Sequence, residues 1–256
     1  MISKNTIKYI RSLHDKKIRD EEQLYVIEGD KLIKGHLDSG GRLRLLAALP
    51  GFIDLLVPAE KEAIDEIEPV SGKDLERMSS LKTPHNAIAL VSMPQPASDP
   101  VKITDSIIIA LESIQDPGNL GTILRAAAWF GFRDLICSPD CADIYNPKVI
   151  QASMGAMQNV TVRYQDLKMI LQEAGKKGLP VFGTYLEGES VYASKPGKRG
   201  IILFGNESRG ISGALLPFVT HKLMIPKFSS SGHGVESLNV GMAASVIFSE
   251  FARRRT

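Results

Sequence analysis

Three polar stretches of the chain carry residue types that could do chemistry. The first holds Asn119 and Arg125, the second reads GNESRG at 205–210, and the third reads ESLN at 236–239. Each lies between an apolar run and a helical pattern, which in open α/β sheets is where ligands gather beyond the carboxyl ends of strands. Glycines in the second stretch would let the backbone approach a ligand closely. One such loop would be an ordinary turn, but three at successive strand ends predict a site.

Several other kinds of site are disfavoured. The first strand of this region is not followed by G-x-G-x-x-G, and no Walker A pattern occurs, so neither a dinucleotide cofactor nor ATP hydrolysis is indicated. The only cysteines are Cys137 and Cys141, which without a second pair indicate neither a disulfide framework nor a zinc site. We expect no metal at the site and two buried or idle thiols.

The elements that must position these loops alternate between strands and helices. Short apolar runs predict strands at 106–111, 135–137, 180–184, 201–204 and 222–226, and apolar spacing predicts helices at 120–130, 147–157, 167–177 and 239–254. The run at 201–204 is continuously apolar, as in a strand buried on both faces of a parallel sheet. We therefore predict an α/β domain over residues 106–256, with a mostly parallel sheet and helices on both faces.

The chain before this domain has its own pattern. Residues 1–95 predict a small α/β domain, with strand candidates at 24–27, 43–49, 53–57 and 87–91 and helices at 3–18 and 30–37. Three prolines and no periodicity between 92 and 101 indicate a linker, which we place at 96–105.

Charge is nearly balanced over the whole chain but not along it. The net charge of +2 does not by itself argue for nucleic acid, whereas six basic residues fall within positions 1–20 and three arginines at 253–255. Such clusters can follow a phosphate backbone, although a solvated helix face is the commoner meaning. The N-terminus lacks the apolar core of a signal peptide and no apolar run is long enough to cross a bilayer, so we expect a cytoplasmic protein with no membrane partner.

The three stretches resemble, in order and spacing, the motifs of the SpoU-TrmH family of RNA ribose methyltransferases within the SPOUT superfamily. They read DPGNLGTILRAAAWFG, then ILFGNESRGIS, then IP followed by ESLNV, and the similarity covers residues 106–254. Residues 1–95, with their basic start and the segment YVIEGDKLI, look like the small substrate-binding domain that often precedes this catalytic domain.

The resemblance implies an enzyme that uses S-adenosylmethionine to methylate a ribose 2′-hydroxyl of rRNA or tRNA, with no metal and no DNA partner. It also implies a homodimer with the site near the subunit interface and a C-terminal trefoil knot, a rare exception to unknotted topology. The implied cofactor contacts are Gly205, Ile225, Leu238, Leu203, Asn206 and Pro226. The implied polar wall facing the target ribose is Asn119, Arg125, Glu207, Ser237 and Asn239.

Each polar residue also has a plainer interpretation. Arg125 is proposed by the resemblance for removal of the hydroxyl proton, yet a guanidinium keeps its own proton far above neutral pH. We favour Arg125 binding the adjacent phosphate and polarising the 2′-oxygen, and the proton acceptor stays open; the alternative is an arginine paired with a carboxylate. Asn119, Asn239 and Ser237 could instead cap helices, and Glu207 could fix Arg209 or lie idle on the surface.

One departure from the family pattern is visible. Nine residues, 227–235, separate Pro226 from ESLN, a longer stretch than the family usually has, and they predict a Ser- and Gly-rich loop beside the cofactor. His233 in this loop has a suitable pKa for a general base, but we rank it below Arg125 because the insertion has no family counterpart.

The basic residues of the first domain are our candidates for gripping RNA through its phosphates. They are Lys4, Lys8, Arg11, Lys16 and Arg19. Two alternatives to the ribose methyltransferase stay open: an enzyme of the same fold that methylates a base nitrogen, and a non-catalytic RNA-binding or assembly protein.

Overall fold

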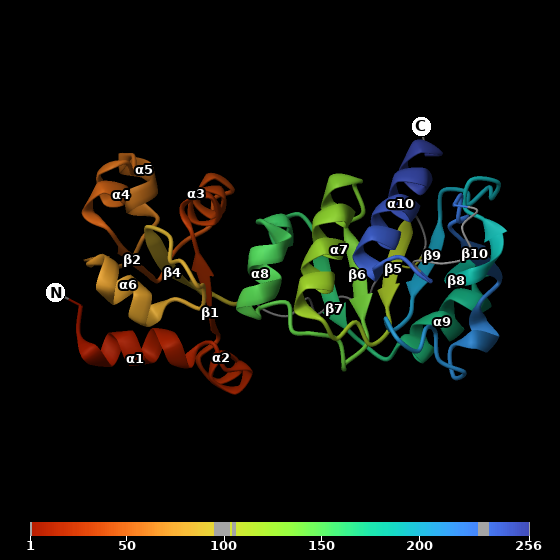
Figure 1. The fold of residues 1–256 in the computed structure, drawn as a ribbon, viewed down its shortest axis with the longest axis horizontal. Helices are drawn as coiled ribbons and strands as arrows, with labels where there is room; N and C mark the ends of the chain where they lie inside the picture. Colours follow the sequence, from red (N-terminus) through yellow and green to blue (C-terminus); the bar gives the residue numbers. More distant parts are fainter. Residues whose placement is uncertain (1, 95–102, 104–105, 230–235, 256) are drawn as a thin grey trace. The chain divides into compact units, whose positions relative to one another are not determined.

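The structure is a computed structural model that describes residues 2–94, 103, 106–229 and 236–255. The chain forms two compact units (Figure 1). The first comprises Met1–Gln95 together with Tyr145–Gln158, and the second comprises Pro96–Ile144 together with Asn159–Thr256. Among the described residues, no helix is long and apolar enough to cross a membrane.

The first unit is built on a four-stranded mixed sheet in the order β1-β4-β2-β3. Strand β4 (Ala87–Ser92) runs antiparallel to both β1 (Leu24–Glu28) and β2 (Leu45–Ala48), and β3 (Ile67–Pro69) runs parallel to β2. The predicted strand at 53–57 is wrong, because Pro50 opens the helix α4 (Pro50–Asp54), and proline suits the first turn of a helix. Strand β3 was not predicted because it is three residues long and only partly buried.

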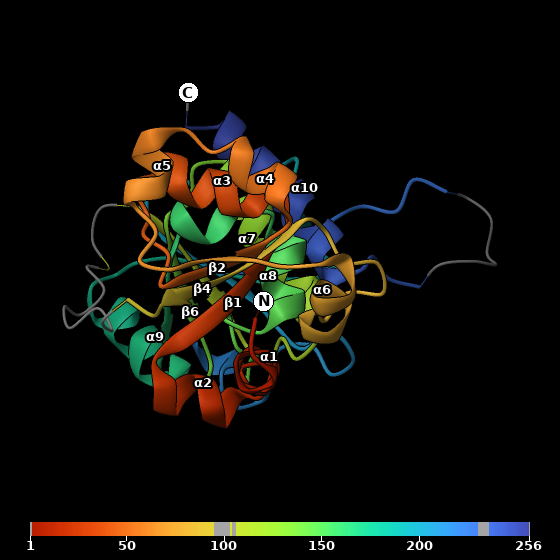
Figure 2. The same ribbon diagram turned by 90° about the vertical axis from the view of Figure 1, so that its left-hand side faces the viewer.

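Helices cover both faces of this sheet (Figure 2). One face packs against α3 (Asp30–Asp38), α4 and the segment that includes α5 (Pro58–Glu62), and the other against α1 (Lys4–Ser12) and α6 (Gly72–Met78). The helix predicted over 3–18 is two helices, because the side chain of Asp15 accepts the backbone N–H of Lys17 at 2.8 Å and starts α2 (Lys16–Glu22).

A segment from much later in the chain completes the core of the first unit. Helix α8 (Pro147–Ser153) and the 3-10 turn η1 (Ala156–Gln158) pack Ile150 and Met157 against the cluster that holds Ile27 and Ile33. The amide of Gln151 donates to the carbonyl oxygen of Glu28 at 2.8 Å. Residues 1–95 therefore share their core with residues that lie between two strands of the second unit in the sequence.

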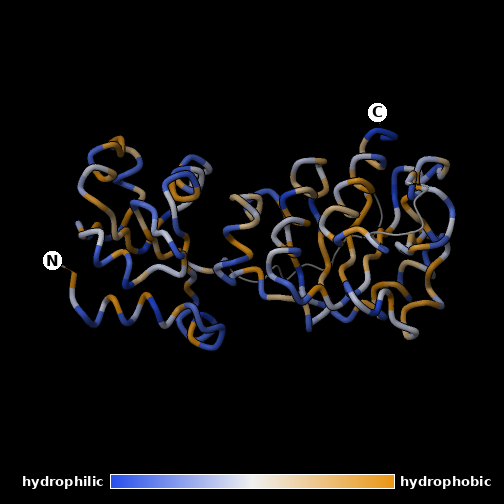
Figure 3. Tube along the Cα trace, viewed as in Figure 1, coloured by the Kyte–Doolittle hydropathy of each residue, from blue (hydrophilic) through white to orange (hydrophobic). Residues whose placement is uncertain are grey.

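The second unit contains a six-stranded sheet in the order β10-β8-β9-β5-β6-β7, and every neighbouring pair is parallel. Its strands are β5 (Ile107–Leu111), β6 (Asp134–Cys137), β7 (Thr161–Tyr164), β8 (Val181–Ser190), β9 (Gly200–Phe204) and β10 (His221–Met224). Hydrophobic residues are concentrated in these strands (Figure 3), as expected where both faces are covered. Strand β7 was not predicted from the sequence, because its residues are exposed or only partly buried and form no apolar run.

Helices lie on both faces of the parallel sheet, as predicted. Helix α9 (Leu167–Lys176) packs on the face that carries Ile108, Ala110 and Leu203. On the other face, Phe248 of α10 (Val240–Arg253) packs against Phe204 of β9, with ring centroids 5.6 Å apart, and α10 packs along α7 (Pro117–Trp129). The trefoil knot stays a prediction from the resemblance.

Because all six strands run the same way, their carboxyl ends share one edge. Leu111 at the end of β5 pairs with Phe204 at the end of β9. The backbone N–H of Glu112 also donates to the carbonyl oxygen of Phe204 at 2.8 Å. The loops that follow β5 and β9 therefore leave the sheet side by side.

Candidate active site

The first loop places Asn119 in the opening turn of α7. The helix is capped by Asp116, whose carboxylate accepts the backbone N–H of Asn119 at 2.7 Å, and Pro117 occupies the first helical position. Asn119 is therefore inside the helix, and the interpretation of it as the helix cap is wrong. Its side-chain amide is free of the backbone and available to the other loops.

The third loop places Asn239 at the start of α10. Its Oδ1 accepts the backbone N–H groups of Gly241 and Met242 at 2.9 and 3.3 Å, so Asn239 is the helix cap. Its Nδ2 donates to Oδ1 of Asn119 at 2.8 Å. The two helices approach closely here, because a Cβ on Gly241 would lie 2.9 Å from a methyl carbon of Thr122.

The second loop contributes Glu207. Oε1 of Glu207 accepts a hydrogen bond from Nδ2 of Asn119 at 3.1 Å, across a separation of 88 residues. Asn239, Asn119 and Glu207 thus form one hydrogen-bonded chain drawn from three loops. The direction of the chain is fixed: the Oδ1 of Asn239 is occupied by N–H groups of α10, so its Nδ2 must donate, and Glu207 is the acceptor at the far end.

This arrangement leaves the Glu207 carboxylate able to accept further hydrogen bonds. A carboxylate offers about four acceptor positions, so it keeps capacity for a ligand hydroxyl after binding Asn119. Glu207 is exposed, and among the described contacts it makes no ion pair with Arg209. The site could therefore orient a ligand that carries a hydroxyl group.

Gly205 determines the path of the second loop. A Cβ at this position would lie 2.2 Å from the carbonyl carbon of Gly210 and 2.3 Å from the nitrogen of Ile211. The loop can therefore fold back on itself only because residue 205 has no side chain.

Arg125 and Ser237 are not part of the hydrogen-bonded series Asn239–Asn119–Glu207. Arg125 is exposed two turns along α7 from Asn119, and no carboxylate in the described part of the chain forms an ion pair with it. The alternative of an arginine paired with a carboxylate is thus not supported. Ser237 is exposed and is not the cap of α10, which is Asn239.

The apolar residues proposed to contact a cofactor divide into two groups. Leu238 is 45% exposed, and Ile225 and Pro226 are half-buried just beyond β10. Leu238 leaves apolar surface open within the third polar stretch, and Ile225 and Pro226 leave some open beyond the end of β10. Leu203, in contrast, is fully buried in the core against α9. Its side chain is not available to a ligand, so a cofactor contact at Leu203 stays a prediction that only its backbone could meet.

Some residues that shape the site were missed by sequence reasoning. Glu112 accepts the backbone N–H of Ser212 at 2.9 Å, and Ser113 accepts an amide hydrogen bond from Asn206 at 2.8 Å through its carbonyl oxygen. Both tie the loop after β5 to the loop after β9. The sequence signal for them was their place at the end of a buried strand, which does not reveal a partner about a hundred residues away.

The basic residues that we expect to bind RNA differ in their exposure. Lys4, Lys8 and Arg11 are exposed on α1, spaced so that they share one face, and no ion pair involves them in the described ranges. We call these three residues the α1 basic face. Arg19 is only 1% exposed and donates to the carbonyl oxygens of Leu13 and His14 at 2.9 and 2.8 Å. It supports the turn after α1, so its assignment to RNA is corrected.

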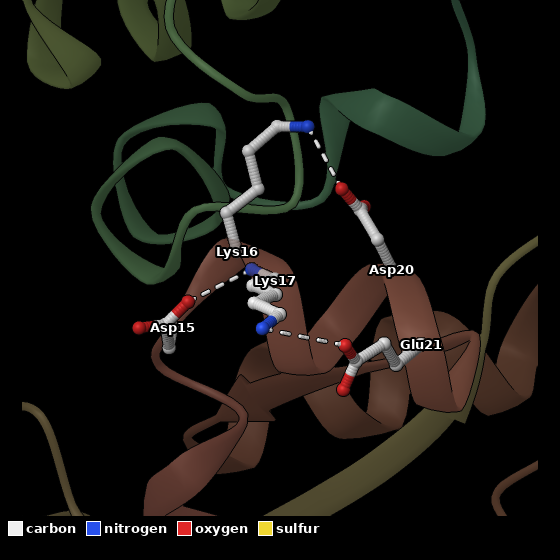
Figure 4. A pocket seen from close by; sticks show the side chains of 5 residues that line it. All are labelled: Asp15, Lys16, Lys17, Asp20 and Glu21. Carbon is white, nitrogen blue, oxygen red and sulfur yellow. Dashed lines mark hydrogen bonds and ion pairs between the residues drawn. The ribbon is translucent and has the colours of Figure 1, made fainter.

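Lys16 lies on a surface of mixed charge on α2 (Figure 4). It forms an ion pair with Asp20 at 2.9 Å, and Lys17 forms one with Glu21 at 3.9 Å. With Asp15 beside them, the acidic residues outnumber the lysines in this pocket. This surface therefore offers phosphate less attraction than the α1 basic face.

Some predicted features lie outside the described residues, and others concern metal binding and the cysteines. Most of the 227–235 segment, including His233, and nearly all of the 96–105 linker lie outside the described residues. Within the described residues, no group of three or more His, Cys, Asp or Glu side chains could hold a metal ion. Cys137 and Cys141 are buried free thiols, as expected.

Known proteins match both units. A family model described as the SpoU rRNA Methylase family matches residues 106–249, and one described as an MRM3-like substrate binding domain matches residues 4–89. The chain is 27% identical over 242 residues to the 23S rRNA (guanosine(2553)-2′-O)-methyltransferase RlmP of Bacillus subtilis, covering 94% of this chain and 93% of that protein.

Two further matches extend over nearly the whole chain. An uncharacterised tRNA/rRNA methyltransferase of Synechocystis is 30% identical over 258 residues, covering 97% of this chain and 91% of that protein. The solved structure of a TrmH-family protein from Porphyromonas gingivalis superposes with a TM-score of 0.84 at 35% identity, covering 99% of both chains.

Proposed function

Because this chain belongs to the SpoU rRNA methylase family, we propose that it transfers a methyl group from S-adenosylmethionine to a ribose 2′-hydroxyl of RNA. The observation that carries this proposal is the hydrogen-bonded chain Asn239–Asn119–Glu207, which joins three loops at one edge of the parallel sheet. A site assembled from three distant loops around an acceptor carboxylate suits a ligand rich in hydroxyl groups.

The residues around the polar chain fit the cofactor. Leu238, Ile225 and Pro226 carry partly open apolar side chains that would suit an adenine ring, and we assign the tight turn that begins at Gly205 to the same cofactor. S-adenosylmethionine, when bound, supplies the methyl group as an electrophile on a sulfonium sulfur.

The protein's own contribution is orientation and charge stabilisation. Glu207 accepts a hydrogen bond from a ribose hydroxyl, and Asn119 and Asn239 keep the carboxylate in place. The guanidinium of Arg125 binds the phosphate next to the target and stabilises the negative charge that develops on the 2′-oxygen. Ser237 provides a further hydroxyl contact. The 2′-hydroxyl proton would leave to phosphate or water as the 2′-oxygen bonds to the methyl carbon and the carbon–sulfur bond breaks, which would leave S-adenosylhomocysteine.

We assign the first unit to RNA binding. The α1 basic face is a row of three exposed cations on a helix whose other face is buried. Such a row positions phosphates without reading bases. Since the relative from Bacillus subtilis acts on 23S rRNA, rRNA is the substrate we propose, with tRNA as the second choice. Two buried free thiols suit the reducing cytoplasm.

We also propose a homodimer formed through the surface that α7 and α10 leave exposed. Trp129 is 84% exposed and Met242 60% exposed, large apolar groups that a second copy would cover. Arg125 lies one helical turn before Trp129, so this pairing would bring it close to the subunit interface.

The dimer is tested by light scattering at micromolar concentration. Trp129→Glu is expected to give a monomer, whereas Leu186→Glu, which changes a 71% exposed leucine of β8, stays dimeric. A monomeric wild-type protein would remove the dimer from the proposal.

The activity is tested by incubating the protein with radiolabelled S-adenosylmethionine and rRNA transcribed in vitro, which lacks modifications. Nuclease digestion and mass spectrometry then locate the methyl group. Label on a ribose supports the proposal, label on a base indicates the base-methylating alternative, and RNA binding without label indicates the non-catalytic alternative. Arg125→Ala is expected to lower the transfer rate while leaving cofactor affinity intact.

A further inference from the structure

Asn206 uses every hydrogen-bonding position of its side chain. Oδ1 accepts the backbone N–H groups of Ser208 and Arg209 at 3.0 and 3.1 Å. Nδ2 donates to the carbonyl oxygen of Ser113 at 2.8 Å and lies 3.3 Å from Oε2 of Glu207. A flipped amide would turn its NH₂ group toward two N–H donors, so this orientation is the one that pairs donors with acceptors. Two lone pairs and two N–H groups are thus all engaged within the protein.

The backbone of Asn206 closes the turn that carries Glu207. Its N–H donates to the carbonyl oxygen of Gly210 at 3.0 Å, and the N–H of Gly210 returns to the carbonyl oxygen of Asn206 at 2.9 Å. Gly210 has φ of +68°, a conformation that favours glycine. Residues 206–210 therefore form a closed turn, and the side chain of Asn206 fastens it to the loop after β5, across 93 residues.

Ser113, the residue that receives this bond, is itself held from several sides. Its φ is +53°, uncommon for serine. Its N–H donates to Oγ of Ser138 at 2.8 Å and its hydroxyl donates to Asp140, which also accepts from Oγ of Ser138 at 2.5 Å. The two hydroxyl donors hold the pKa of Asp140 below its usual range, as expected of a carboxylate that acts as acceptor. The carbonyl of Ser113 is therefore a fixed anchor.

The carboxylate of Glu207 lies between two amide donors. Nδ2 of Asn119 reaches Oε1 at 3.1 Å, and Nδ2 of Asn206 approaches Oε2 at 3.3 Å. Removing the donor of Asn206 would release one end of the carboxylate and detach the turn from Ser113 at the same time. The turn itself would survive, because its closing bonds involve Oδ1 and the backbone.

We propose that the side chain of Asn206 is a positioning group for methyl transfer, which acts by holding Glu207 toward Asn119, and that this side chain makes no contact with the cofactor. A side chain with no unused donor or acceptor has nothing left to offer a cofactor. This inference rests on the proposed function, because it gives Asn206 a part in that reaction.

Asn206→Asp in the full-length protein tests the proposal. Aspartate keeps an acceptor for Ser208 and Arg209 but turns a second oxygen toward Ser113 and Glu207. With S-adenosylmethionine affinity measured by calorimetry and methyl transfer measured in a single turnover at saturating cofactor and RNA, we expect the affinity to change by less than about threefold and the rate constant to fall on the order of 10²-fold, as for a reacting group displaced by about an ångström.

Two further variants sharpen the result. Asn159→Asp makes the same charge change at an exposed residue with no side-chain hydrogen bond in the described structure, and is expected to keep wild-type values. Asn206→Ala removes the acceptor as well, so it should weaken cofactor binding in addition to the rate, because the turn next to Gly205 then loses two bonds.

The possible results separate clearly. A wild-type rate in Asn206→Asp, with the wild-type enzyme active, overturns the inference and leaves the proposed function standing. A loss of cofactor affinity with the rate at saturation preserved also overturns it, in favour of direct cofactor contact. A wild-type protein that transfers no methyl group to RNA overturns both.

Discussion

The substitution Gly205→Ala tests the geometry of the second loop. The added methyl group would lie 2.2 Å from the carbonyl carbon of Gly210 and 2.3 Å from the nitrogen of Ile211. Contacts below about 3 Å with backbone atoms cannot be relieved by turning a side chain, so the backbone must move. The loop that carries Glu207 would open at the point where it folds back.

The size of the effect follows from the cost of overpacking. Forcing an extra methyl group into a filled space costs about 1 to 3 kcal/mol. For a unit of about 150 residues this lowers the melting temperature of the second unit by about 2 to 12 °C. If Gly205 also contacts the cofactor, affinity for S-adenosylmethionine should fall at least about tenfold, equivalent to about 1.4 kcal/mol.

Differential scanning calorimetry and cofactor titration measure these two quantities. Gly213→Ala is the matched control, because a Cβ at this exposed glycine meets no atom within 4 Å and its φ is not in the left-handed region. It should leave stability within about 0.5 kcal/mol and affinity unchanged. Wild-type stability and cofactor affinity in Gly205→Ala would refute the steric argument and the place of this loop in the site.

Three other outcomes are expected. Ile150→Ala, at a core position 4% exposed, should destabilise the first unit by about 2 to 5 kcal/mol in chemical unfolding; a neutral effect would contradict the packing of α8 into that unit. Replacing all three residues of the α1 basic face with alanine should reduce the slope of log RNA affinity against log salt by about 2 to 3; an unchanged slope would remove the face from the interface. Hydrogen bonds from Arg253 and Arg254 lower the pKa of Glu250 to about 2. Because the folded-state pKa is depressed, the stability from this carboxylate is present above the ordinary pKa near 4.5 and is lost as the pH falls toward 2, so Glu250→Gln should flatten acid unfolding within that window.

The sequence predicted the parallel sheet well because most of its strands are short, continuously apolar runs between helical patterns. Runs at 106–111 and 201–204 became β5 and β9, which pair in parallel at the centre of the sheet. Prediction failed where the local pattern was weak or was common to strands and helices. The run at 53–57 is apolar, but a preceding proline directs the chain into a helix, and β7 is too exposed to show a buried pattern.

For the site, the sequence supplied residue types but not their partners. Asn119, Glu207 and Asn239 were singled out, and the structure joins them in one hydrogen-bonded chain. Leu203 and Arg19 were selected by type and position, yet both are buried, because tertiary packing decides which side of a strand or helix is covered. Exposure is a property of the folded neighbours and not of the residue alone.

By itself, then, the sequence determined the parallel sheet, the three loops at its carboxyl edge and the polar groups they carry, because alternation, apolar runs and glycines act over a few residues. Only the tertiary structure decided which groups meet. The bond from Asn206 to Ser113 spans 93 residues and the bond from Asn239 to Asn119 spans 120, and α8 joins the core of the first unit from a position between β6 and β7. Such pairings depend on how strands are ordered in space, and no local pattern encodes that order.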